Sequence, residues 1–196
     1  MKTLVLGSTS VFRKAILEKL NLNFICDKPD IDETPLPHET PEQLVERLAL
    51  GKAKKVAESH RNALIIGSDQ VAVHQGEILG KPGSCENAIN QLMRFSGDKV
   101  TFLTSLCLYN SGDDSYQVIV EPFNVYFREL SLTQVTAYVN AEQPLHCAGS
   151  FKSEGLGICL FERLEGDDPN SLIGLPLIGL TKLLANQGID VLALQA

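Results

Sequence analysis

A polar tetrapeptide, GSDQ (67–70), follows an unbroken apolar run, ALII (63–66). Apolarity without a period predicts a strand that is buried on both faces, and it places Asp69 at the carboxyl end of that strand. In α/β sheets, ligand sites open at the carboxyl ends of strands, where a carboxylate can orient or deprotonate water. Asp69 is therefore the first candidate for a catalytic residue, and a simple cap on the next turn is the alternative.

A group of hydroxyl residues lies in GSTSVFRK (7–14), between an expected strand and an expected helix over residues 10–20. Amides at a helix N-terminus bind anions, most often phosphate, and arginine can hold a phosphate with two hydrogen bonds. Ser8, Ser10 and Arg13 are thus candidate phosphate ligands, although a capped helix with a solvated arginine explains the same residues. Neither GxxxxGK[ST] nor GxGxxG is present, so a nucleotide site here would be of another type.

Three more charged residues extend this set toward phosphoryl chemistry. Glu33 lies in a proline-rich loop and would be a natural oxygen ligand for Mg²⁺. Lys52 lies beside the apolar stripe of a helix expected from Pro41 to about residue 59. Lys81 stands between a glycine and a proline at the end of an expected hairpin over 70–80. A metal and lysines would neutralise phosphates while the acid activates water, whereas solvated loop acids and surface lysines are the plainer interpretation.

Composition limits the other function classes. The 196 residues suffice for one α/β domain, and no apolar run approaches the roughly 20 residues of a membrane-spanning helix. The N-terminus lacks the apolar region of a signal peptide, so we expect a cytoplasmic protein with no membrane partner. Five scattered cysteines and four dispersed histidines indicate neither a disulfide framework nor a zinc site. A net charge of −7 argues against nucleic-acid binding but not against a small phosphorylated ligand.

Strand and helix patterns alternate along the chain, which predicts an α/β protein with an elongated mixed sheet flanked by helices. Two long strands joined by a short turn would extend a second lobe. No linker separates independent domains, so residues 1–196 are expected to form one domain. The remaining elements are strands over 3–7, 23–26, 101–110, 116–127 and 157–166, and helices over 84–97, 131–140 and 175–188.

The chain contains seven motifs in the order in which the Maf family of nucleotide pyrophosphatases has them: STSVFRKAIL, DIDET, LALGKAKKVA, IIGSDQVAV, ILGKP, AGSFKSEGLG and GDDPNSLIGLPL. It resembles that family from Ser8 to Leu177. The resemblance implies an ITPase-like fold with two lobes around a cleft. It also implies cleavage of nucleoside triphosphates between the α- and β-phosphates with a divalent metal, Mg or Mn, and makes a homodimer plausible.

Carried over by position, the family's active-site set falls on Ser8, Arg13, Glu33, Lys52, Asp69 and Lys81. The resemblance implies that Asp69 is the catalytic base, with Lys81 and Glu33 also in the catalytic set. Glu33 and Asp69 would hold the metal. The phosphates would be bound by Ser8, Ser10, Arg13 and Lys52.

Three positions depart from the branch of the family that cleaves dTTP and UTP. Phe12 stands at an arginine position, Gln70 at a threonine position and Glu154 at a glutamine position, so these three are implied to read the base. In these respects the chain resembles the branch that prefers 7-methyl-GTP. The expected reaction is hydrolysis to 7-methyl-GMP and diphosphate, which removes a modified nucleotide. A dTTP or UTP pyrophosphatase and a non-catalytic nucleotide-binding regulator of cell division remain alternatives.

Overall fold

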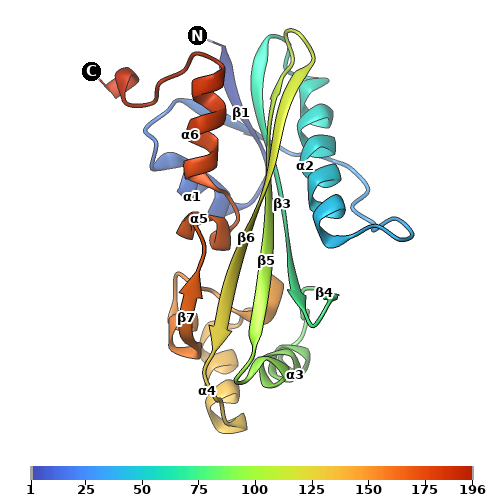
Figure 1. Ribbon diagram of the computed structural model, residues 1–196, viewed down its shortest axis with the longest axis vertical. Coiled ribbons are helices and arrows are strands. Elements are labelled where there is room, and N and C mark those ends of the chain that lie inside the picture. Colours follow the sequence, from blue (N-terminus) through green and yellow to red (C-terminus); the bar gives the residue numbers. More distant parts are fainter. Residues whose placement is uncertain (1, 196) are drawn as a thin grey trace. The chain divides into compact units, whose positions relative to one another are not determined.

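Three long strands are shared between two parts of the molecule. A computed structural model describes residues 2–195, and these fall into two compact units (Figure 1). The first unit runs to Asp69 and also contains Thr104–Glu121 and the residues from Asp168 onward; the second contains Gln70–Leu103 and Pro122–Asp167. Three of the four boundaries therefore fall inside strands, namely β3 (Ala63–His74), β5 (Lys99–Asn110) and β6 (Ser115–Phe127).

Across the described residues the sheet has seven strands in a mixed arrangement, which confirms the α/β fold class expected from the sequence. The single domain over 1–196 and the cleft between lobes stay predictions. Within residues 2–195, no helix combines the length and the apolarity needed to cross a membrane.

The central strands of the first unit's sheet are buried on both faces. Its strand order is β2 (Phe24–Asp27), β1 (Thr3–Gly7), β3, β5 and β6, and β1 is parallel to both of its neighbours. Successive side chains of a strand point to opposite faces. Leu6 and Ile66 therefore join one apolar cluster, while Val5 and Ile65 join another.

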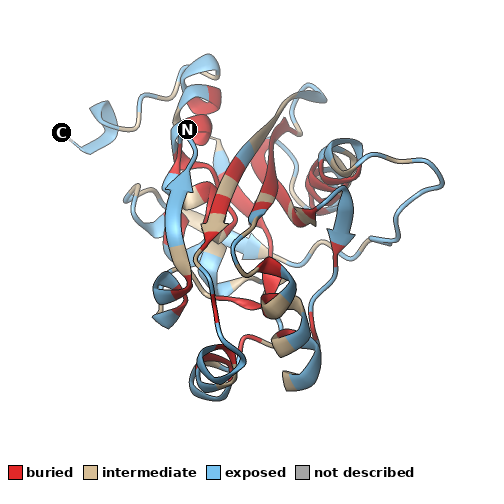
Figure 2. Ribbon diagram, turned by 60° about the horizontal axis from the view of Figure 1, so that its bottom comes forward, coloured by how far each residue is buried: buried red, intermediate tan, exposed pale blue. Residues whose placement is uncertain are grey.

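Different helices cover these two faces (Figure 1). Helices α1 (Val11–Glu18) and α6 (Leu177–Asn186) add their apolar residues to the cluster that contains Leu6. Helix α2 (Pro41–Ala57) packs its small residues Ala49 and Ala53 on the face that contains Val5. Figure 2 shows the central strands of the sheet and the inner side of α2 as buried, whereas the loop that precedes α2 is largely exposed.

Local signals in the sequence predicted where the helices begin. Thr40 Oγ1 accepts a hydrogen bond from the Gln43 amide, and Gln43 Oε1 accepts one from the Thr40 amide, so a capping box opens α2. The same reciprocal pair opens α4 (Leu132–Glu142) at Ser131 and Gln134. The last expected helix is α6, and a short helix that the sequence did not predict, α5 (Pro169–Ile173), precedes it. A 3-10 turn, Ala193–Gln195, follows.

The second unit contains the other halves of β3, β5 and β6 and completes them with two antiparallel edge strands. Strand β4 (Glu77–Leu79) pairs with the end of β3 through a turn at Gln75 and Gly76, whose φ angles of 50° and 84° suit a tight hairpin. Strand β7 (Phe161–Glu165) pairs with β6. Helices of this unit are α3 (Cys85–Phe95), α4, and the 3-10 segments η1 (Ala148–Ser150) and η2 (Leu156–Leu160).

The strand expected over 157–166 is therefore too long at its start, because its first residues belong to η2. A Cβ on Gly157 would lie 2.3 Å from the Lys152 carbonyl oxygen, so the chain folds back on itself there and cannot be extended. The strand begins only at Phe161, whose ring packs edge-on against Phe127 and Phe151.

The structure contradicts the position assigned to Asp69. Residues 63–67 and the first hairpin strand form one continuous strand, β3, so Asp69 lies inside it and not at its end. The pairing with β1 stops at Ile66, but the side chain of Ser105 keeps the next residues in place. Its hydroxyl accepts a hydrogen bond from the Asp69 amide at 3.1 Å and donates to the Val45 carbonyl at 2.6 Å. Asp69 thus lies beyond the end of β1, on a strand that continues.

Candidate active site

Lys52 joins the two carboxylates that the sequence singled out. Its Nζ lies 2.6 Å from Asp69 Oδ1 and 2.7 Å from Glu33 Oε1. The side chains of Lys52 and Asp69 are only 6% and 11% exposed, whereas that of Glu33 is 57% exposed. A buried ammonium therefore holds one buried acid and draws a loop acid to the same point, which a solvated surface lysine would not do.

A glycine makes this approach possible. A Cβ on Gly67 would lie 2.1 Å from the Ala49 carbonyl oxygen, so only glycine lets the backbone of α2 come this close to β3. Lys52 follows Ala49 by about one helical turn, and Asp69 follows Gly67 by two residues, which returns to the same face of the strand. The contact between helix and strand thus brings ammonium and carboxylate together.

Arg13 belongs to the same charged group. Its Nε donates to the Gly174 carbonyl at 2.9 Å, and Ser68 Oγ donates to that carbonyl oxygen at the same distance. Burial lowers the pKa of the Arg13 guanidinium, while the nearby charges of Asp69 and Glu33 act in the opposite direction. Two cations, Arg13 and Lys52, are therefore near two carboxylates in the first unit.

Ser8 and Ser10 lie where β1 leads into α1. Ser8 is buried, and its Oγ accepts a hydrogen bond from the Ser10 amide at 3.1 Å. Ser10 is the N-cap of α1, because its Oγ accepts from the Arg13 amide at 3.3 Å. Both hydroxyls thus have a structural function that is compatible with a further contact to an anion. Phe12, one residue into the helix, is 40% exposed and is not a core residue.

The donor set suits a hard divalent cation. Glu33 and Asp69 supply carboxylate oxygens that meet at one ammonium nitrogen, and Mg²⁺ is commonly held by one or two carboxylates together with phosphates and waters. Within residues 2–195, no three His, Cys, Asp or Glu side chains gather as a metal site of protein ligands alone. All five cysteines are free thiols.

Three other candidates belong to the second unit. Gln70 is the residue of β3 that follows Asp69, Lys81 is exposed in the loop after β4, and Glu154 is exposed in the loop before η2. Burial raises the pKa of the Cys147 thiol, and the charges of Glu154 and Lys81 both act on it, so these two side chains lie in the same region of the unit. That these three share a site with the residues of the first unit stays a prediction.

Several residues of the site were missed by the sequence reasoning. Ser68 fixes the Gly174 carbonyl, and Ser105 fixes the Asp69 amide. Asp168 is fully buried; its Oδ1 accepts from the Asn170 amide at 2.8 Å and its Oδ2 from the Ile178 amide at 2.7 Å, which starts α5 and α6. The signal for Asp168 was present, because Asp-Pro at a helix start is a common N-cap pattern.

The fold defines the class of protein first. The chain is similar to the structure of a HAM1 protein from Coxiella burnetii, with a TM-score of 0.52 and 14% identity over 95% of this chain and 100% of that one. At this identity the likeness concerns the fold alone, and it confirms the ITPase-like α/β class. Within that class, the chain belongs to the Maf-like protein family, which it matches over residues 3–187.

Curated relatives cover the chain almost completely. It is 63% identical over 196 residues to a 7-methyl-GTP pyrophosphatase of Colwellia psychrerythraea, covering 100% of this chain and 98% of the relative. Relatives of the same name from Vibrio cholerae and Pseudoalteromonas translucida are 58% and 55% identical, over 96% and 98% of this chain and 97% and 96% of theirs.

Proposed function

We propose that this protein is a nucleoside triphosphate pyrophosphatase that hydrolyses 7-methyl-GTP to 7-methyl-GMP and diphosphate, and so removes a modified nucleotide. The observation that carries the proposal is near-complete coverage by relatives of that name at 55–63% identity. The charged group around Lys52 provides chemistry suited to such a reaction. Incubation with 7-methyl-GTP and quantification of both products tests it; binding without diphosphate release would instead indicate a nucleotide-binding regulator.

In the proposed reaction, Asp69 takes a proton from a water molecule. The water oxygen bonds to phosphorus, and the bond from that phosphorus to the oxygen that bridges the α- and β-phosphates breaks. Lys52 holds the Asp69 carboxylate in one position through a contact of 2.6 Å, so the base is oriented before substrate arrives. Arg13, Ser8 and Ser10 are proposed to bind phosphate oxygens, and so is Lys81 of the second unit.

A divalent metal, Mg²⁺ or Mn²⁺, is part of this proposal. Two carboxylates offset the two cations Arg13 and Lys52 in the first unit, so this part of the site is close to neutral. A triphosphate brings several negative charges, and a metal held by Glu33 and Asp69 would supply the missing positive charge and neutralise the phosphates. The cytoplasmic location and a homodimer stay predictions from the sequence.

Removing a phosphate-binding cation should weaken hydrolysis of every triphosphate alike. We expect Lys81→Ala and Arg13→Ala each to lower kcat/KM by about 10²-fold, because each removes a preorganised charge from the phosphates. The measurement is kcat/KM for 7-methyl-GTP, GTP, dTTP and UTP. Arg13→Ala also removes the bond to Gly174, so its melting temperature must be recorded beside that of Lys81→Ala, whose exposed side chain makes the cleaner test. A loss of kcat/KM for only one of the four nucleotides would instead indicate that the residue contacts the base.

Selectivity is proposed to come from Phe12, Gln70 and Glu154. N7-methylation gives guanine a delocalised positive charge, which an aromatic face attracts by about 0.5–2 kcal/mol. Phe12 is half-exposed at the first turn of α1 and thus available for such a contact. Glu154 is proposed to accept hydrogen bonds from the guanine N1–H and amino group, which contribute about 1.5–3 kcal/mol when one partner is charged, and Gln70 to add an amide contact.

We therefore expect 7-methyl-GTP to be preferred over GTP, dTTP and UTP by at least about tenfold in kcat/KM. Phe12→Arg combined with Glu154→Gln should erode this preference while turnover persists. The measurement is kcat/KM for each of the four nucleotides, made on the wild type and on the double variant. A wild type that cleaves dTTP or UTP best would contradict 7-methyl-GTP as the preferred substrate. The protein would then be a dTTP or UTP pyrophosphatase.

A further inference from the structure

The loop that carries Glu33 is mostly exposed, and its own hydrogen bonds join only residues two or three apart in the chain. Glu33 is surrounded by exposed residues, and the stretch Pro35-Leu36-Pro37 offers a single amide hydrogen because proline has none. The Glu33 side chain is itself 57% exposed. Such a loop would leave its carboxylate mobile unless something outside the loop held it.

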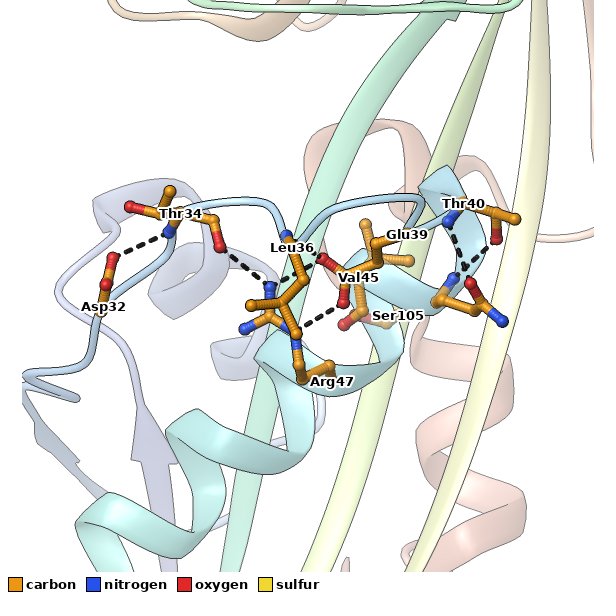
Figure 3. Close-up of polar contacts among 9 residues, drawn as sticks. Asp32, Thr34, Leu36, Glu39, Thr40, Val45, Arg47 and Ser105 are labelled. Atoms are coloured by element: carbon orange, nitrogen blue, oxygen red, sulfur yellow. Dashed lines mark hydrogen bonds and ion pairs between the residues drawn. The ribbon is translucent and has the colours of Figure 1, made fainter.

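Arg47 of α2 is that external support (Figure 3). Its Nε and Nη2 bind the two oxygens of Glu39 at 2.5 and 2.8 Å, a two-pronged contact of the strongest kind for this pair. Nη2 also donates to the Thr34 carbonyl at 3.1 Å. One side chain thus binds the loop on both sides of the two prolines, beside Glu33 and close to the start of α2.

Glu39 carries the support further into the loop. Its Oε2 accepts the Leu36 amide at 2.9 Å, so the one amide between the prolines is satisfied by the same carboxylate that Arg47 binds. The Glu39 side chain is only 7% exposed. Asp32 accepts the Thr34 amide at 2.9 Å on the other side of Glu33. The backbone on both sides of Glu33 is thereby fixed.

Arg47 and Lys52 are on the same helix, and both contact the loop: Arg47 at Thr34 and Glu39, Lys52 at Glu33. The hydrogen bond from Arg47 lowers the pKa of Glu39 to about 2, so Glu39 stays ionised in neutral solution. The hydrogen bond to Glu39 is in turn the main cause that raises the pKa of Arg47, and the charge of Asp69 adds to it. The support therefore persists over the pH range in which the enzyme would work.

We propose that Arg47 is a positioning residue, which holds residues 32–39 against α2 through Glu39 and the Thr34 carbonyl and so keeps Glu33 at Lys52. Arg47 is not proposed to contact substrate. The kinetic part of this inference rests on the proposed function, and the structural part does not.

The structural test is hydrogen exchange of the Leu36 amide, followed by NMR in the wild type, Arg47→Ala and Lys55→Ala. Lys55 is the matched control, since it is an ion-paired cation of the same helix whose partner is Glu58. We expect exchange at Leu36 to rise by at least about tenfold in Arg47→Ala, with β3 amides unchanged, and to stay at the wild-type rate in Lys55→Ala. An unchanged rate at Leu36 in Arg47→Ala would overturn the proposal.

The kinetic test asks whether Arg47 acts through Glu33. We expect Arg47→Ala and Glu33→Gln each to lower kcat/KM for 7-methyl-GTP by about 10–10²-fold, and the double variant to be no worse than the poorer single one. Arg47→Lys should not restore activity, because an ammonium cannot make the two-pronged contact. Losses that multiply in the double variant would contradict the proposal.

A second variant covers the case in which Arg47→Ala does not fold. Glu39→Gln weakens the contact between Arg47 and Glu39 from the loop side. It must raise hydrogen exchange of the Leu36 amide as Arg47→Ala does. Its loss in kcat/KM must likewise not multiply with that of Glu33→Gln. A wild type that hydrolyses no triphosphate would defeat the proposed function while the exchange result stands. Wild-type exchange at Leu36 in folded Glu39→Gln and Arg47→Ala would defeat the positioning role alone.

Discussion

Replacing Asp69 by asparagine is expected to lower kcat for 7-methyl-GTP by about 10²–10⁴-fold, the usual effect of losing a general base. Asparagine has nearly the same shape and its amide oxygen can still accept from Lys52, which also keeps its contact with Glu33 at 2.7 Å. The cooperative unfolding transition should therefore change little, and kcat should fall far more than nucleotide affinity. Steady-state kinetics, nucleotide binding and thermal unfolding of the variant together make the measurement.

The matched control is Asp98→Asn. Asp98 is also an aspartate paired with a buried partner, since its Oδ2 lies 2.9 Å from His74 Nε2, but it is not among the proposed site residues. Its variant should keep the wild-type kcat. Asp69→Asn that retains most of the wild-type kcat would remove Asp69 from the mechanism, and an equal loss in both variants would point to damage to the fold.

Removing divalent cations with excess chelator is expected to abolish hydrolysis, and added Mg²⁺ or Mn²⁺ should restore it. The physical reason is charge: with Arg13 and Lys52 offset by Glu33 and Asp69, the first unit brings little net positive charge to a triphosphate. A metal ion would supply it and act on the phosphate oxygens. Activity as a function of metal concentration, after exhaustive chelation, is the kinetic measurement.

Binding supplies an independent readout. Calorimetric titration of Mg²⁺ or Mn²⁺ into the protein with a non-hydrolysable triphosphate should show a site that Glu33→Gln weakens. As a control, Cys26→Ser with Cys159→Ser, which removes two exposed free thiols, should not change metal affinity, because hard cations prefer oxygen. Full activity in chelator, or a metal site lost with the thiols, would refute the assignment of Glu33 and Asp69.

Interactions within a few residues were readable from the sequence. The capping boxes at Thr40 and Ser131 connect residues three apart, so the residue types at this spacing predict them. The Gln75-Gly76 turn depends on adjacent residues in the same way. The sequence singled out Lys52 because it lies beside an apolar stripe, and the structure shows its side chain buried. The motif order indicated the family, because seven motifs in one order are far more specific than any one of them.

Tertiary structure decided the rest, since the partners lie far apart in the chain. Asp69 lies inside β3 because that strand also pairs with β5, and Ser105 of β5, 36 residues away, binds its amide. The Gly174 carbonyl meets Arg13 across 161 residues. No local pattern encodes such pairs, because they depend on which strands become neighbours and how closely a helix can approach, as Gly67 allows α2 to do. The sequence thus determined the types of the candidate site residues, and packing brought Arg13, Glu33, Lys52 and Asp69 together.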